Sequence, residues 1–164
     1  MSKKRKKSLV CLLLLIAYSI RYFIAFVRLN WQMQYDFLPC SEIAEGLHEY
    51  VELYGETYDP NNEEHANNRV GMYILDINHD GITDYMIDGG NLLRGCSGST
   101  YAILLGDEKG QFESIGAIYV RDFFFLLPHL TIFGNYPHIL LPEGDFRIIR
   151  FNRGKYEDPH VYGG

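Results

Sequence analysis

Four oxygen-bearing side chains are spaced so that they could share one metal ion. They occupy positions 1, 3, 5 and 9 of one loop and are Asp76, Asn78, Asp80 and Asp84. Gly81 stands at position 6, where a calcium loop turns sharply, and the carbonyl of Ile82 at position 7 is the expected backbone ligand. Ca²⁺ takes about six to eight hard oxygen ligands at roughly 2.3–2.6 Å. The spacing therefore predicts a calcium site made of the four side chains and the Ile82 carbonyl.

The same residue types also build turns that hold no metal. Asp, Asn and Gly supply side-chain-to-backbone hydrogen bonds and positive φ angles in tight turns. In addition, position 12, where an EF-hand has a bidentate Glu, is Ile87 here. We therefore expect Ca²⁺ to bind weakly, with a Kd of roughly 10⁻⁴–10⁻³ M as in extracellular modules. A metal-free turn is the alternative.

The residues on both sides of the loop have the pattern of β-strands. In the stretch before the loop, Val70, Met72 and Ile74 alternate with Gly71, Tyr73 and Leu75. After it, Tyr85–Ile87 is rich in aromatic and β-branched types. A D-x-N-x-D-G-x-x-D loop between two strands resembles the calcium loops of FG-GAP and VCBS repeats. The resemblance covers residues 70–90 and implies a Ca²⁺-binding β-hairpin. Since a propeller needs at least four blades of about 40–50 residues, one such loop favours a smaller sheet domain.

The N-terminus combines a basic cluster with an apolar run. Lys3–Lys7 is entirely basic, and residues 8–27 are apolar apart from Arg21 and a few small polar residues. Twenty helical residues span about 30 Å, which is enough to cross a bilayer, and the preceding charges hold the N-terminus in the cytoplasm. Arg21 would extend its charge toward the outer headgroups.

We expect residues 1–28 to be an uncleaved signal-anchor in the cell inner membrane. The alternative is a signal peptide cleaved after Ala17-Tyr-Ser19, a small-x-small site, which would release a secreted domain. Both fates place the domain in the periplasm or another extracytoplasmic space. There, Cys40 and Cys96 are candidates for a disulfide, with two separate thiols as the alternative.

The remaining chain divides into a linker and one exported domain. We expect residues 29–40 to be the linker and 41–164 the domain. Ser41 is a good N-cap, so a helix is predicted from there to Gly55, with its apolar stripe packed on a sheet. After the loop hairpin, short strands alternate with turns, including strands at 100–105 and 112–120. The fold class is therefore α+β, mainly antiparallel β in a curved sheet or small sandwich with one packed helix.

Charge is distributed unevenly along the chain. The net charge is −6, but from residue 29 onward eight basic residues face twenty-one acids, a net charge of −13. An acidic domain is a poor nucleic-acid binder, because the phosphate backbone requires Lys and Arg. It is suited to cations and to basic protein partners.

No catalytic arrangement is evident. Gly95–Ser99 lacks the G-x-S-x-G spacing of a serine nucleophile, and the histidines lack zinc-site spacing. We therefore expect no enzyme, but a membrane-anchored acidic domain that binds Ca²⁺ weakly and recognises another protein, as an inhibitor or immunity protein does. The alternatives are a structural envelope component without a specific partner and, less favoured, a hydrolase.

Overall fold

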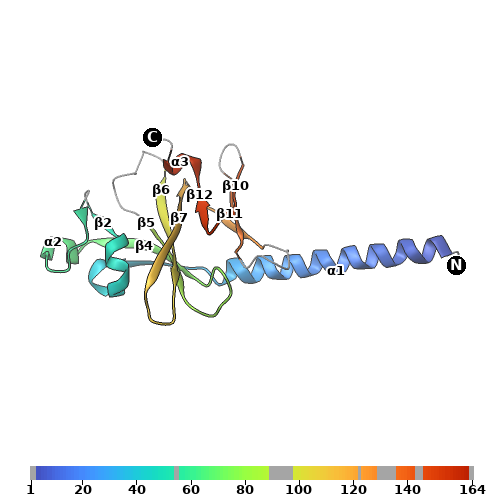
Figure 1. Cartoon of the computed structure of the whole chain (residues 1–164), viewed down its shortest axis with the longest axis horizontal. Helices are drawn as coiled ribbons and strands as arrows, with labels where there is room; N and C mark the ends of the chain where they lie inside the picture. Colours follow the sequence, from blue (N-terminus) through green and yellow to red (C-terminus); the bar gives the residue numbers. More distant parts are fainter. Residues whose placement is uncertain are drawn as a thin grey trace.

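A single long helix leaves one side of a β-rich domain (Figure 1). The computed structural model describes residues 3–53, 56–88, 98–121, 123–128, 136–142 and 146–162. Helix α1 runs over Lys3–Trp31. Within its segment Ser8–Trp31, an 18-residue stretch reaches a mean hydropathy of 2.3, and the segment is long and apolar enough to cross a membrane. The expected N-terminal apolar helix is therefore present.

Seven strands form the main sheet, in the order β1-β4-β5-β6-β7-β12-β11. Their bounds are β1 (Gln34–Pro39), β4 (Arg69–Leu75), β5 (Asp84–Asp88), β6 (Ser99–Gly106), β7 (Phe112–Val120), β11 (Phe151–Asn152) and β12 (Lys155–Glu157). Neighbouring strands are antiparallel except β12 and β7, which are parallel. The predicted strands at 100–105 and 112–120 are confirmed as β6 and β7.

Within the described ranges, two smaller sheets accompany the main sheet. The three-stranded sheet has the order β10-β9-β8, and the two-stranded sheet pairs β2 with β3. Their bounds are β2 (Glu52–Leu53), β3 (Glu56–Thr57), β8 (Phe125–Leu127), β9 (His138–Leu141) and β10 (Arg147–Ile149). Two short α-helices, α2 (Glu63–Ala66) and α3 (Pro159–Tyr162), are also present.

Both faces of the main sheet are apolar and covered. One face contributes residues such as Met86, Ile103 and Ile118 to a core closed by the three-stranded sheet and by Leu29 of α1. The other face contributes Val70, Met72, Ile87 and Leu104 to a second core, which is closed by the segment 40–58. Alternation along the strands produces this division, because successive side chains point to opposite faces. The expected α+β class with mainly antiparallel β structure is confirmed.

The predicted helix from Ser41 to Gly55 is wrong. The segment forms two short 3₁₀ helices instead, η1 (Cys40–Glu42) and η2 (Glu45–Tyr50), and Ile43 between them is extended, with φ −79° and ψ 154°. Gly46 packs so closely on the β6–β7 turn that a Cβ would lie 3.1 Å from the Gly110 carbonyl oxygen. The apolar stripe is nevertheless buried against the sheet, since Ile43, Leu47 and Val51 all belong to the second core.

The expected linker over residues 29–40 is also not a linker. It contains the last turn of α1 and strand β1, which pairs with β4 over its whole length, from Gln34 opposite Ile74 to Pro39 opposite Arg69. Residues 29–40 therefore belong to the domain. Polar and apolar types alternate from Gln32 to Phe37, and this period of two was the available sequence signal for the strand.

The end of α1 is fixed to strand β8. The Asn30 Nδ2 donates to the Leu126 carbonyl oxygen at 2.9 Å, and the Asn30 Oδ1 accepts from the Leu126 N–H at 2.9 Å. The Phe26 and Phe125 rings lie 6.0 Å apart, and Leu29 is buried in the core. The helix and the domain therefore share an ordered junction rather than a flexible hinge.

Replacing Asn30 tests this junction. Asn30→Ala leaves a β8 N–H and C=O without their side-chain partner, so we expect it to lower the free energy of unfolding by about 1–3 kcal/mol. The measurement is chemical unfolding of the full chain in detergent micelles. Gln32→Ala, at an exposed neighbouring position, is the matched control. Equal stability of the two variants would mean that the Asn30 bonds do not hold α1 on β8.

Candidate functional site

The loop between β4 and β5 is organised by its own polar side chains. Asp76 accepts backbone N–H groups from Asp80 and Gly81, each at 3.1 Å. Asn78 accepts the Asp80 N–H at 3.1 Å and donates its Nδ2 to Asp80 Oδ2 at 2.8 Å. Asp80 in turn accepts the Ile82 N–H at 2.8 Å. Three of the four predicted ligand side chains therefore meet in one hydrogen-bonded cluster.

Two residues of the loop have positive φ angles, which produce its sharp reversal. Gly81 has φ 86°, a conformation that glycine adopts without the steric cost of a Cβ. His79 has φ 61° and is exposed. Gly81, at position 6 of the predicted calcium loop, therefore has a positive φ angle that favours glycine over other residues.

Asp84, the fourth predicted ligand, has a different environment. Its carboxylate is fully buried and accepts two backbone N–H groups, from Ile77 at 2.7 Å and from Gly106 at 3.0 Å. The first bond closes the neck of the loop, and the second joins the start of β5 to the end of β6. Asp84 therefore ties three segments together whether or not a cation is present.

Burial determines the electrostatics of Asp84. Desolvation raises the pKa of its carboxyl from 3.8 to about 6, against the opposing effect of the two amide hydrogen bonds. The negative charges of Asp80 and Asp76 make smaller contributions to this raised pKa. The carboxylates at positions 1, 5 and 9 are therefore close enough to repel one another, and a bound cation would relieve that repulsion.

The predicted ligands are gathered only in part. Asp76, Asn78 and Asp80 contact one another, and Ile82 joins them through its N–H group. Within the ranges that the structure describes, no three His, Cys, Asp or Glu side chains are arranged to hold a metal ion. The predicted ligand set also includes the side-chain amide of Asn78 and the backbone carbonyl of Ile82, which are not His, Cys, Asp or Glu side chains.

Two further residues shape this loop, and spacing did not identify them. Ile77, between the first two predicted ligands, is fully buried and belongs to the core that also contains Met86 and Ile103. Gly106 supplies the N–H that holds Asp84, although it lies 22 residues further along the chain. The apolar side chain of Ile77 was the sequence signal for its burial. The hydrogen bond from Gly106 to Asp84 could not be predicted from spacing, because it depends on how β5 and β6 pair.

The candidate disulfide stays a prediction. Cys40 is a free and fully buried cysteine, and burial raises the pKa of its thiol. Cys96 lies outside the described residues, as does most of the Gly95–Ser99 segment. Cys11 is exposed on α1, as expected for a residue of an apolar membrane-type helix.

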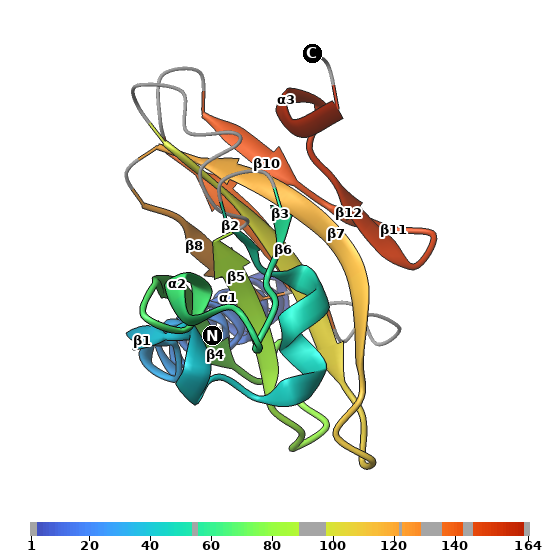
Figure 2. The ribbon, with the colours of Figure 1, turned by 90° about the vertical axis from the view of Figure 1, so that its left-hand side faces the viewer.

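Apart from the β4–β5 loop, one surface of the domain is acidic. The segment 29–68 contains nine Asp or Glu residues and no Lys or Arg. It builds β1, η1, η2, β2, β3 and α2, and all of these except β1 lie at the end of the domain away from α1 (Figures 1 and 2). Among the acidic side chains of this segment whose exposure the structure describes, seven are exposed, namely Glu42, Glu45, Glu49, Glu56, Asp59, Glu63 and Glu64. We refer to these seven as the distal acids.

No protein-family model, curated protein or solved structure matches this chain. The likeness to FG-GAP and VCBS calcium loops rests on the residues of the β4–β5 loop and stays a prediction.

The buried Asp84 carboxyl predicts a specific pH dependence of stability. Its pKa is raised in the folded chain, so between about pH 3.8 and pH 6 the folded state holds more protons than the unfolded state. The contribution of Asp84 to the free energy of unfolding therefore falls as the pH rises through this window, by about 3 kcal/mol in total.

Asp84→Asn cannot titrate, and it should remove this decline. The measurement is urea unfolding of the wild type and the variant across the window, in metal-free buffer with a chelator. Asp107→Asn changes an exposed carboxylate of the β6–β7 turn that also accepts backbone N–H groups, and it should leave the decline in place. Parallel curves for wild type and Asp84→Asn would contradict the assignment.

Proposed function

We propose that this chain is a membrane-anchored domain outside the cytoplasm that recognises a basic protein through the distal acids. Ca²⁺, bound weakly by the β4–β5 loop, stabilises the domain. The observation that carries this proposal is the polarity of the molecule along the axis of α1. An apolar, membrane-length helix leaves one end, and the distal acids occupy the other (Figure 1).

The anchor is supported by the order of charged and apolar residues. Lys3–Lys7 precedes the apolar segment, which by the positive-inside tendency retains the N-terminus in the cytoplasm and exports the domain. The exposed apolar residues Ile20, Phe23 and Ile24 support an uncleaved helix, because cleavage after Ser19 would leave a mature chain that begins with an exposed apolar helix. The helix then holds the domain at a fixed position on the membrane surface.

The distal acids support a basic partner. Like charges with no interspersed cation generate a negative potential that attracts a positively charged surface and accelerates encounter. Their position, farthest from the helix, makes them accessible to a protein approaching from outside. Such recognition acts by occupying a partner rather than by chemistry, as an inhibitor or immunity protein does.

The calcium proposal is supported by the donor set of the β4–β5 loop. Asp76, Asn78, Asp80, Asp84 and the Ile82 carbonyl would hold the ion, and oxygen donors of these kinds are those that Ca²⁺ prefers. The mutual repulsion that raises the Asp84 pKa is a reason for a cation to stabilise the folded loop. Binding at this position stiffens the connection between β4 and β5.

Calcium titration tests the loop directly. Titration calorimetry of the full chain in micelles should give a Kd of roughly 10⁻⁴–10⁻³ M, as for extracellular modules. At free Ca²⁺ about ten times the Kd, the free energy of unfolding should rise by roughly 1.4 kcal/mol.

Asp80→Ala removes a ligand from an exposed position, so it should abolish both the heat and the stabilisation. Asp107→Asn, in the neighbouring turn, should retain both. If wild-type protein shows neither heat nor a higher unfolding midpoint at millimolar Ca²⁺, the loop is a metal-free turn.

Neutralising part of the distal acids tests partner recognition. The variant with Glu45, Glu49, Glu63 and Glu64 all changed to Gln should capture less of its partner from envelope extracts than wild type does, because the attraction depends on these charges. Capture should also weaken at high salt. The measurement is quantitative mass spectrometry of proteins retained by the tagged full chain.

The matched control changes Asp107, Glu108 and Glu113, which lie in and beside the β6–β7 turn, to their amides and should capture as wild type does. Retention of no specific protein by the wild type, or equal retention by both variants, would overturn recognition through the distal acids. The domain would then fit the alternative of a structural envelope component.

A further inference from the structure

The three-stranded sheet exposes an apolar outer face. Its inner residues, such as Leu126, Ile139 and Ile149, are buried in the core. On the opposite face, the strand register places Leu140 directly beside both Phe125 and Ile148. Phe125 is 36 % exposed and Ile148 is 49 % exposed. These three residues form one apolar row across all three strands.

Two more aromatic residues extend this row. Phe123 is 52 % exposed, and its ring centroid lies 5.5 Å from that of Phe125. Phe146, two residues before Ile148 and therefore on the same side of an extended chain, is 74 % exposed. We call Phe123, Phe125, Leu140, Phe146 and Ile148 the apolar platform. A water-exposed sheet face normally carries polar residues at these positions. An apolar environment would therefore stabilise the platform relative to water.

The platform is continuous with the surface of α1. Phe125 contacts Phe26 of the helix, with ring centroids 6.0 Å apart, and β8 is the strand to which Asn30 is bonded. Figure 1 shows the three-stranded sheet on the side of the domain from which α1 departs. Since the platform lies on the face of that sheet opposite the core, it faces along α1 toward its N-terminus.

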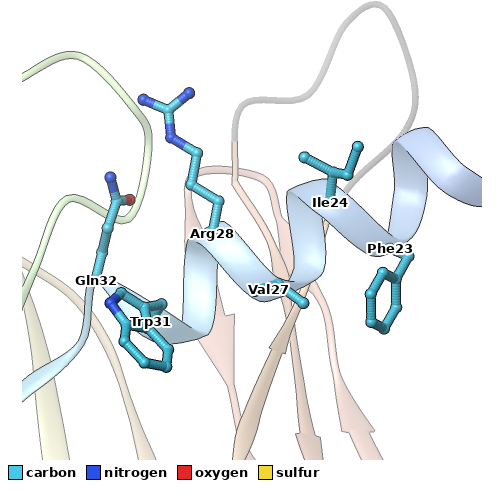
Figure 3. Close-up of a pocket in the computed structure, with 6 residues that line it drawn as sticks. All are labelled: Phe23, Ile24, Val27, Arg28, Trp31 and Gln32. Atoms are coloured by element: carbon cyan, nitrogen blue, oxygen red, sulfur yellow. The ribbon is translucent and has the colours of Figure 1, made fainter.

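The position of the bilayer surface along α1 can be derived in two ways. A hydrocarbon layer of about 30 Å takes roughly 20 helical residues, so a span that begins at Ser8 leaves the layer near Val27. Independently, Arg28 and Trp31 are residue types that favour the membrane interface. Trp31 is 87 % exposed, and both side chains line an open, largely apolar hollow on α1 (Figure 3). Both estimates put the Phe26–Phe125 contact at the outer edge of the hydrocarbon.

We propose that the apolar platform rests on the outer leaflet of the membrane beside α1, with its aromatic and aliphatic side chains in the interfacial layer. The bilayer is the occupant because α1 brings it to Phe125, and the sheet then extends sideways from that point. The exposed Arg150, directly after β10, can meet lipid phosphates at the edge. This inference rests on the proposed membrane anchor.

Fluorescence quenching by lipid can test the platform and the anchor separately. Trp31 is the single tryptophan of the chain, so each variant reports one position. The full chain is reconstituted in vesicles of phosphatidylcholine and phosphatidylglycerol, with or without bromine atoms on the acyl chains. Native protein reports Trp31. In the Trp31→Phe background, Ile148→Trp reports the far strand of the platform, and Phe37→Trp is the control.

The control is matched in exposure and differs in position. Phe37 is 47 % exposed, close to the value of Ile148. It lies on β1, which leads from the end of α1 to η1. An amphipathic surface enters about 5–10 Å into the headgroup and acyl boundary, so brominated lipid should reduce the emission of Trp31 and of Ile148→Trp. The emission of Phe37→Trp should be unchanged. Phe146→Trp, at the most exposed platform position, repeats the measurement if Ile148→Trp does not fold.

The outcomes distinguish the two proposals. Quenching at 31 and at the platform, without quenching at 37, supports both. Quenching at 31 alone overturns the platform and leaves the anchor intact, as happens if a second copy or another protein covers the sheet. Equal quenching at the platform and at 37 also overturns it. Absence of quenching at 31 overturns the anchor and the platform together.

Discussion

The main sheet has two apolar faces, and covering both is the constraint on which the rest of the structure depends. Strand alternation sends Met86 and Ile103 to one side and Val70, Met72 and Leu104 to the other. Neither face could remain in water, because each carries enough apolar area to dominate folding. The three-stranded sheet with the end of α1 covers one face, and the segment 40–58 covers the other. The outer surface of the three-stranded sheet differs in character from the outer surface of the segment 40–58.

The two covers give the molecule its polarity. The segment 40–58 fills its side of the sheet with Ile43, Leu47 and Val51, and its remaining positions carry distal acids. The three-stranded sheet fills the other side, and its outer face presents the apolar platform next to α1. Packing of the same main sheet therefore places an acidic surface and an apolar surface on different sides of the domain. Both proposals about binding follow from this division.

Buried carboxylates join elements that sidechain packing alone would leave loosely connected. Asp84 joins the neck of the β4–β5 loop to the end of β6. Asp158, also fully buried, accepts from the Tyr119 and His160 N–H groups and from the Arg147 guanidinium at 2.8 Å. It thereby connects β7, β10 and the start of α3. Burial of a charge without such partners would be strongly unfavourable, so each carboxylate indicates a junction at which the local backbone is fixed.

Several features follow from the sequence without any tertiary information. The apolar run after Lys3–Lys7 determines a membrane-length helix, because helix length and composition are local properties. The apolar run over 70–75, which has a polar residue on each side, predicts β4, and Gly81 with the spaced oxygens of Asp76, Asn78 and Asp80 predicts a tight polar loop. The regular turns after residue 98 determine an antiparallel β domain. Each of these depends on interactions between residues close together in the chain.

Tertiary structure decided the features that depend on distant residues. The stripe of Ile43, Leu47 and Val51 predicted a helix, but close packing of Gly46 on the β6–β7 turn favours two 3₁₀ helices, which bury the same side chains. Residues 34–39 become a strand only because the edge of β4 is free to pair with them. The second role of Asp84, its bond to Gly106, requires β5 and β6 to lie side by side. The apolar platform likewise exists only because β8, β9 and β10 align Phe125, Leu140 and Ile148, which sequence spacing cannot reveal.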